Sequence, residues 1–188
     1  MRRILNLSLF ALVATVLILV LLWAFRGQAL RLFGISFDTG AAAETALVLP
    51  DGYRADVFAS NLAIPRFMAV SEDGVLFVAD PGAGRVVALP DRDGDGRADE
   101  TVVVGEGYDA AHSLAFESDG SLLVAGSGTL FRLTLDADLR EVAREDVLTY
   151  PRAGQHSTRT VAVAPDGSLL ISVGSSCNAC WEDDERRA

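Results

Sequence analysis

Apolar and polar residues alternate in three short stretches of the chain, and an Asp-Gly pair interrupts each stretch. The stretches read FMAVSEDGVLFVAD, SLAFESDGSLLVAG and TVAVAPDGSLLISV, and they begin at Phe67, Ser113 and Thr160. Alternation on both sides of an Asp-Gly pair is typical of a β-hairpin, because glycine supplies the positive φ that such turns require. The pattern therefore predicts three β-hairpins.

The hairpins repeat at a nearly constant interval. Their turn aspartates, Asp73, Asp119 and Asp166, are 46 and 47 residues apart. The runs GRVVAL (84–89) and GTLFRLTL (128–135) supply a third strand in the first two repeats. A repeat of this length with several strands per copy is typical of a four-stranded propeller blade, and no long amphipathic helical pattern interrupts it. The sequence predicts an all-β fold, a β-propeller.

About three such blades fit into the chain, whereas propellers close with four to eight. The third repeat ends in the polar segment CNACWEDDERRA, without its outer strands. We therefore expect a piece of a longer protein. A small open sheet that is complete in itself is the alternative, but it would leave sheet edges unpaired and repeats uncapped.

An apolar run without any charge covers residues 4–25 near the N-terminus. It is long enough to cross a bilayer as a helix. It ends at Trp23-Ala24-Phe25-Arg26, where the small-residue cleavage site of a signal peptide is missing. The sequence predicts a transmembrane anchor over residues 1–26, a linker over 27–46 and a partial propeller over 47–188.

Charge narrows the range of partners. All sixteen basic residues are arginine, so the chain has no lysine for a Schiff base or a P-loop. Four of them lie at or before Arg31, and the rest of the chain carries 12 basic against 26 acidic residues. Such a domain is a poor partner for nucleic acid. With a cysteine pair that suits an oxidising compartment, we expect a domain exported to the periplasm or cell exterior.

His156 is the first candidate for chemistry. It precedes the first strand of the third hairpin, which places it at the expected mouth of the propeller channel, where propellers bind ligands. A neutral imidazole can accept a proton near physiological pH. A general base and a hydrogen-bonded loop residue both fit this pattern.

The acidic segment DRDGDGRADE, residues 91–100, has the spacing of a calcium loop. Asp91, Asp93, Asp95 and Asp99 stand at positions 1, 3, 5 and 9, with Gly96 at the sharp turn. The twelfth position is not the expected glutamate, and no helix pair flanks the segment. Weak or structural calcium binding and a solvated acidic turn both fit.

The two cysteines, Cys177 and Cys180, form a C-x-x-C motif. Trp181 stands where a haem-attachment motif needs histidine, and zinc would need a second cysteine pair. The motif follows a hairpin and not a βα turn, which argues against thioredoxin-like chemistry. The favoured interpretation is a structural disulfide.

The segment GQHSTRTVAVAPDGSLLISVGSSCNAC, residues 154–180, resembles the glucose/sorbosone dehydrogenase family, and its L-sorbosone dehydrogenase-like branch in particular. The resemblance covers residues 47–188. It implies a six-bladed quinoprotein propeller that oxidises a sugar, sugar aldehyde or related alcohol, with pyrroloquinoline quinone (PQQ) and calcium as cofactors. Its specific part consists of His156, Arg159, Pro165-Asp166-Gly167, Val173-Gly174 and the Cys177-Asn178-x-Cys180 loop.

The resemblance also implies roles for single residues. His156 matches the base that takes the sugar hydroxyl proton while hydride passes to PQQ. His112, in AAHSLAF, resembles a PHGLAF pattern of the branch that points at the channel mouth, so it contacts cofactor or substrate or is structural. Arg159 pairs with quinone carboxylates or forms a structural salt bridge.

One departure from the family concerns the residue that orients the histidine. In the glucose-oxidising branch an acidic residue follows the strand-end glycine, whereas here Ser175 follows Gly174. Serine fixes an imidazole less well than a carboxylate does, which weighs against glucose as substrate. Because most quinone ligands of the family come from later blades, we expect this chain to be inactive alone.

Two other functions fit the same sequence. A non-catalytic propeller that acts as a binding module needs only the repeats. A calcium-dependent lactonase-type propeller would use the carboxylates. The expected partners are a sugar or sugar aldehyde and, through the N-terminal helix, a membrane, while the electron acceptor stays unidentified.

Overall fold

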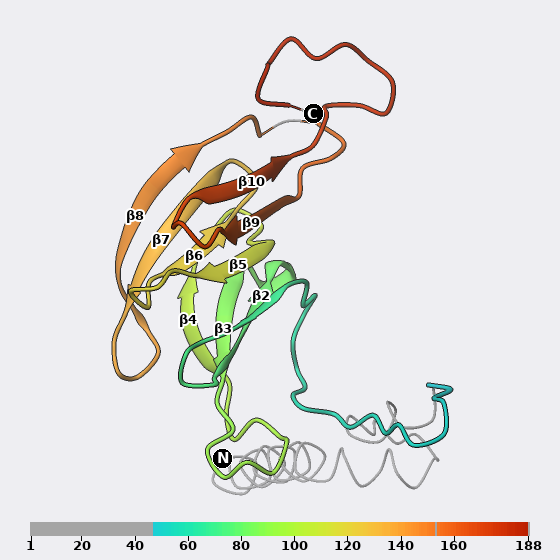
Figure 1. Cartoon of the computed structure of the whole chain (residues 1–188), viewed down its shortest axis with the longest axis vertical. Coiled ribbons are helices and arrows are strands. Elements are labelled where there is room, and N and C mark those ends of the chain that lie inside the picture. Colours follow the sequence, from blue (N-terminus) through green and yellow to red (C-terminus); the bar gives the residue numbers. More distant parts are fainter. Residues whose placement is uncertain (1–46, 153, 188) are drawn as a thin grey trace, which may run out of the picture. The chain divides into compact units, whose positions relative to one another are not determined.

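The computed structural model describes residues 47–152 and 154–187, which form three antiparallel sheets (Figure 1). The first sheet has the order β1-β2-β3-β4, the second has the order β5-β6-β7-β8, and the third consists of β9 and β10. A single 3-10 turn, η1, follows β2 in the described part. The bounds are β1 Met68–Val70, β2 Leu76–Asp80, η1 Pro81–Ala83, β3 Arg85–Leu89, β4 Val102–Glu106, β5 Ser113–Phe116, β6 Leu122–Ala125, β7 Thr129–Leu135, β8 Glu141–Thr149, β9 Arg159–Val163 and β10 Leu169–Val173.

The three predicted hairpins are confirmed, since β1 pairs with β2, β5 with β6 and β9 with β10. Their turns share one chemistry. The turn glycines Gly74, Gly120 and Gly167 have φ of 82°, 85° and 84°. Each glycine N–H donates to the carbonyl oxygen three residues earlier, at 3.0, 3.0 and 2.9 Å. A side chain at these positions would strain the backbone, so glycine determines where each hairpin turns.

The first two sheets are meanders in which strands that follow one another in the chain lie side by side. The predicted third strands are present as β3 and β7, and the fourth strands, β4 and β8, were not predicted individually. The described part of the chain is therefore an all-β fold of antiparallel sheets, consistent with a piece of a propeller.

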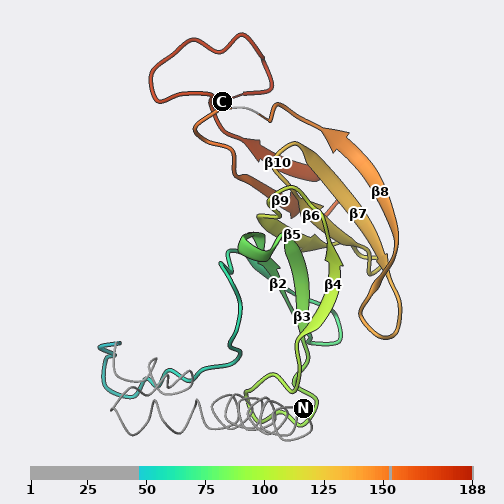
Figure 2. The same ribbon diagram turned by 180° about the vertical axis from the view of Figure 1, so that it is seen from behind.

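The second sheet packs against its neighbours through both of its faces (Figure 2). Leu122 and Val124 of β6 join a cluster with the first sheet, while Leu123 and Ala125 join another that contains Val161 of β9. All four β6 side chains are buried. Strand β5 also contacts both β1 and β9. The residues that precede these three first strands are thus brought to one end of the sheets.

The predicted anchor, residues 1–26, and the predicted linker, residues 27–46, lie outside the described residues. Within the described ranges, no helix combines the length and apolar character needed to cross a bilayer. Residues 47–55 belong to a separate unit from the sheets, and in it the Tyr53 N–H donates to the Pro50 carbonyl at 3.2 Å.

Asp80, at the end of β2, is a buried acid that binds the main chain of the segment preceding β1. Its carboxylate accepts hydrogen bonds from the N–H groups of Ala63 (3.0 Å) and Ile64 (2.7 Å) and from Arg85 Nε (3.1 Å). Burial acts to raise the pKa of Asp80, but these hydrogen bonds and the Arg85 charge outweigh burial and hold the pKa below its usual value of 3.8.

We expect Asp80→Asn to lower the free energy of unfolding at pH 7 by about 1–3 kcal/mol, the range for hydrogen bonds to a charged group. Because the folded pKa lies below the unfolded one, the carboxylate stabilises the fold above the unfolded pKa and stops doing so as pH falls through the folded value. The difference between wild type and variant should shrink below about pH 4. Urea unfolding at a series of pH values measures it, and a difference independent of pH would contradict this role.

Candidate functional site

His156 lies in the loop that connects β8 to β9, and its side chain is exposed. Its Nε2 is 2.8 Å from the Oδ1 atom of Asn178. An amide oxygen can only accept a hydrogen bond, so Nε2 donates and, in the neutral ring, Nδ1 is left as the proton acceptor. The loop therefore presents an imidazole in a defined tautomer.

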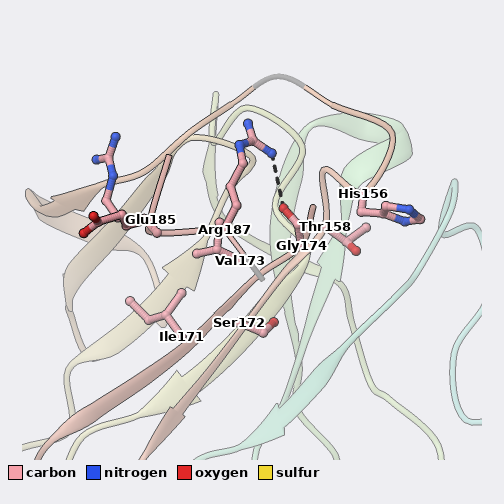
Figure 3. A pocket seen from close by; sticks show the side chains of 9 residues that line it. His156, Thr158, Ile171, Ser172, Val173, Gly174, Glu185 and Arg187 are labelled. Atoms are coloured by element: carbon pink, nitrogen blue, oxygen red, sulfur yellow. Dashed lines mark hydrogen bonds between the residues drawn. The ribbon is translucent and has the colours of Figure 1, made fainter. Parts of the chain in front are cut away.

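A pocket of about 480 Å³ borders His156 (Figure 3). Glu185, Arg186 and Arg187 also line it, and Arg187 Nη1 donates to the Gly174 carbonyl at 3.2 Å. A Cβ atom on Gly174 would lie 2.7 Å from His156 Cβ, closer than real contacts allow. Glycine at the end of β10 is thus what lets the histidine sit against this pocket.

A second pocket, of about 270 Å³, lies where the starts of the three repeats meet. Its polar lining consists of one guanidinium, one imidazole and three hydroxyl groups, and none of the described residues contributes a carboxylate to it. The guanidinium and the hydroxyl groups are hydrogen-bond donors, which suits an anionic ligand. The lining residues are Ile64, Arg66, Pro81, Gly82, Ala110, His112, Ser127, Ser157 and Thr158.

His112 lines this second pocket and also has structural contacts. Its Nδ1 donates to the carbonyl oxygen of Arg159 at 3.0 Å, and its ring centroid is 4.8 Å from that of Phe67. The neutral ring then keeps Nε2 as an acceptor. The structure supports the structural role of His112, and its contact with cofactor or substrate stays a prediction.

Arg66 is a pocket residue that the sequence analysis did not select. The repeats nevertheless contain the signal for it, because Arg66, His112 and Arg159 each stand seven residues before their turn aspartate. Equivalent positions in successive repeats come together at the same end of the sheets. An alignment of the three repeats on their turn aspartates therefore places Arg66 at the same position as His112 and Arg159.

Arg159 is fully buried at the start of β9. Its Nη1 donates to the carbonyls of His156 (2.8 Å) and Thr158 (2.9 Å), and its Nη2 donates to that of Pro151 (2.5 Å). Burial lowers the pKa of this guanidinium. Its Nε has no hydrogen-bond partner among the described residues. Arg159 therefore fastens the loop that carries His156, and its predicted contact with quinone carboxylates stays a prediction.

Three of the four predicted calcium ligands come together in the loop between β3 and β4. Carboxylate oxygens of Asp91, Asp93 and Asp95 lie within 4.8 Å of one another. Asp99 is outside this group, and its carboxylate accepts the Arg92 N–H at 2.7 Å. The loop could hold a hard cation through the first three aspartates.

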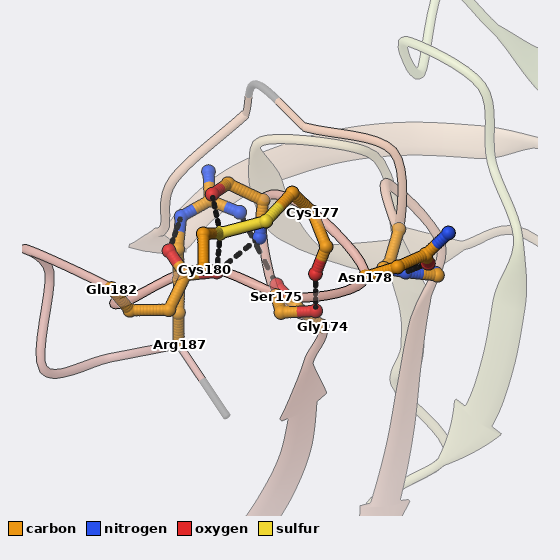
Figure 4. Close-up of a disulfide and its surroundings, with 9 residues drawn as sticks. Gly174, Ser175, Cys177, Asn178, Cys180, Glu182 and Arg187 are labelled. Atoms are coloured by element: carbon orange, nitrogen blue, oxygen red, sulfur yellow. Dashed lines mark hydrogen bonds and ion pairs between the residues drawn. A yellow bond between two sulfur atoms is a disulfide. The ribbon is translucent and has the colours of Figure 1, made fainter.

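A disulfide joins Cys177 to Cys180 with an S–S distance of 2.06 Å (Figure 4). The small loop that it closes follows β10 and carries Asn178, the partner of His156. Ser175 Oγ donates to the Cys177 carbonyl at 2.8 Å. The cysteine motif thus lies directly beside the candidate base.

Comparison with solved structures finds similar chains among carbohydrate-active enzymes and sugar dehydrogenases. The calcium structure of Trichoderma reesei Carbohydrate-Active Enzymes Family AA12 is 25% identical, with a TM-score of 0.60 over 69% of this chain and 34% of that one. The PQQ domain of pyranose dehydrogenase from Coprinopsis cinerea is 21% identical, with a TM-score of 0.61 over 69% and 32%. The PQQ-bound aldose sugar dehydrogenase from Streptomyces coelicolor is 18% identical, with a TM-score of 0.51 over 63% and 40%.

The last two likenesses show the fold alone. This chain spans about a third of the length of the first two structures. A search of the curated proteins found no match. The resemblance to glucose/sorbosone dehydrogenases is confirmed by a family model, described as TrAA12-like, that matches residues 47–186, together with the 25% identical AA12 structure. The chain therefore belongs to the TrAA12-like family.

Proposed function

We propose that the complete protein is a PQQ-dependent dehydrogenase of a sugar, sugar aldehyde or related alcohol, and that residues 47–188 provide its base as part of a six-bladed propeller. The observation that carries the proposal is His156, held by Asn178 at the edge of a pocket with one ring nitrogen left to accept a proton. The family relationship and the sugar dehydrogenases among the structures of similar fold support it.

The residues present fit the cofactor. PQQ carries three carboxylates, and the second pocket offers the Arg66 guanidinium and three hydroxyl groups as donors, with no acid among the described residues that line it. PQQ, when bound, would supply the oxidant that accepts hydride. His156 would take the substrate hydroxyl proton on Nδ1, while Arg159 holds the carbonyl of that same residue. Since the chain covers about a third of its relatives, we expect it to need the remaining blades for activity.

The test is to titrate the full-length protein with PQQ and calcium, and then to assay aldoses and sugar aldehydes with an artificial electron acceptor. PQQ-dependent turnover of a sugar or sugar aldehyde is the expected result. Saturable sugar binding without turnover would favour a non-catalytic binding module. Calcium-dependent lactone hydrolysis without PQQ would favour a lactonase-type propeller. Either of these two outcomes overturns the proposal.

We also propose calcium binding at Asp91, Asp93 and Asp95, whose clustered oxygens are the kind of ligand that Ca²⁺ prefers. Asp93→Asn combined with Asp95→Asn should weaken calcium binding by the full-length protein by about tenfold or more, because calcium affinity follows the number of charged ligands. Calorimetry measures this. Asp99→Asn, outside the cluster, is the control, and equal affinities for all three proteins would contradict the site.

For the N-terminal part we propose an anchor over residues 1–26 and a linker over 27–46, with the domain in the periplasm or outside the cell. A reporter fused after Gly40 should be exported, and the protein should stay in the membrane fraction after a carbonate wash. The uninterrupted apolar run from Ile4 to Phe25 is the reason. Recovery of a shortened soluble protein would show a cleaved signal instead.

A further inference from the structure

Ser175 stands at the position where the glucose-oxidising branch has the acidic residue that orients the histidine, but its side chain does not contact His156 in a hydrogen bond. Ser175 follows the strand-end Gly174, and its Oγ donates to the carbonyl of Cys177 at 2.8 Å. Because Ser175 has a single hydroxyl proton and donates it to the disulfide loop, this residue has no donor left for His156. A different side chain must fix the imidazole.

We propose that Asn178, held on the loop closed by the Cys177–Cys180 disulfide, is the positioning residue of His156. This inference rests on the proposed function, in which His156 is the base. The 2.8 Å contact from Nε2 to Asn178 Oδ1 selects the tautomer in which Nδ1 accepts. An amide is uncharged, so it orients the ring but stabilises the imidazolium less than a carboxylate does.

Main-chain contacts hold the two loops together and set the distance between His156 and Asn178. The Gln155 N–H donates to the Ser176 carbonyl at 2.9 Å. Gly154, with φ of +127°, has no room for a side chain, because a Cβ there would lie 2.6 Å from Ser176 Cα. A substitution at this glycine would push the loops apart, so their close approach is built into the sequence.

The disulfide loop is itself tied down around Asn178. The two half-cystines flank Asn178 in the sequence and restrict its backbone. On the other side, the Glu182 carboxylate accepts the Ser176 N–H and lies 3.9 Å from Arg187 Nε (Figure 4). Cross-link and ion pair together limit how far Asn178 can move from the imidazole. This gives the C-x-x-C motif a function: it supports the partner of the base.

The test compares Asn178→Ala and Asn178→Asp in the full-length enzyme loaded with PQQ. Asn178→Ala should lower kcat by about 10–100-fold, the usual effect of losing a group that orients a ligand or base. KM and PQQ affinity should change less than about twofold. Gln155→Ala removes an exposed amide side chain next to His156 but keeps the main-chain N–H that bonds Ser176, so it should leave kcat unchanged.

Asn178→Asp tests the positioning role through the pH dependence of the rate, which would not change if Asn178 had only a structural role. A carboxylate at this position favours the imidazolium, so the acid limb of the pH–rate profile should shift to higher pH while activity is retained. The other charged groups on this pocket, Glu185, Arg186 and Arg187, are the same in every variant. An unshifted limb in Asn178→Asp would overturn the proposal.

A double-mutant cycle tests the contribution of the disulfide. Cys177→Ser with Cys180→Ser should lower kcat, and adding Asn178→Ala should lower it little further, because both changes release the same contact. If the reductions in kcat are additive, the disulfide does not act through the contact between Asn178 and His156. If His156→Asn lowers kcat but Asn178→Ala does not, the positioning role fails while the base stands. If His156→Asn has no effect, the proposed function fails first.

Discussion

Replacing His156 by asparagine in the complete protein is expected to lower kcat by about 10²–10⁴-fold, the usual contribution of a positioned general base. The fold and the affinity for PQQ should persist, because this exposed loop residue contributes little to core packing. Asparagine keeps a polar side chain of similar reach but cannot take up a proton. Steady-state kinetics of the PQQ-loaded enzyme, with PQQ binding followed by its absorbance, measures both quantities.

The pH dependence separates a base from a packing residue. Histidine side chains titrate close to neutral pH, so the variant should lose the limb of the pH–rate profile that reports the base. His112→Asn is the comparison, and it should act mainly on KM if that residue contacts substrate. A His156→Asn enzyme with near wild-type turnover and an unchanged pH–rate profile would show that the histidine has only a structural role. The binding module would then be the better interpretation.

The parts of the fold that the sequence predicted are those determined locally. Alternating apolar residues around Asp73-Gly74 and its two repeats are enough to define a hairpin, since the left-handed glycine fixes where the chain reverses. Strand β8, Glu141–Thr149, was not predicted because it is an exposed strand at the sheet edge with charged residues on both faces. Such an edge strand pairs through its backbone, and its side chains leave a weak pattern.

The candidate site could be predicted only where its residues belong to local sequence patterns. His156 and the cysteine pair belong to recognisable segments, so sequence alone could select them. The contact between His156 and Asn178 joins residues 22 positions apart through the docking of two irregular loops, for which no periodic pattern exists. Asp99 likewise lies outside the group of the other aspartates and accepts a hydrogen bond from the Arg92 N–H, an arrangement that residue spacing cannot decide.

Arg159 shows how a correct choice of residue can leave its role open. The sequence assigned it to quinone carboxylates or to a salt bridge, while the structure buries its guanidinium against three backbone carbonyls. In the described part of the chain no carboxylate pairs with it within ion-pair distance. Its Nε, which has no hydrogen-bond partner among the described residues, is a donor left for a ligand. The two roles predict different outcomes for the same substitution.

We expect Arg159→Met to lower the free energy of unfolding of the full-length protein by about 2–4 kcal/mol, because each part-buried carbonyl that loses its donor costs up to about 1–3 kcal/mol and water replaces only part of the loss. The loop with His156 is then released, so kcat should fall as well. Arg152→Met is the matched control. Arg152 forms an exposed pair with Asp109, 2.5 Å between Nη2 and Oδ2, and should contribute less than about 1 kcal/mol.

Urea unfolding and PQQ titration of the same two variants distinguish the roles of Arg159. Loss of stability with PQQ affinity retained would establish that the guanidinium holds the loop through Pro151, His156 and Thr158. Unchanged stability with PQQ affinity weakened by about tenfold or more would assign it to the cofactor, as expected for one charge-assisted hydrogen bond to a carboxylate. In that case the contacts with the three carbonyls contribute little to the stability of the fold, and Arg159 Nε, which has no partner among the described residues, is the donor that would contact a quinone carboxylate.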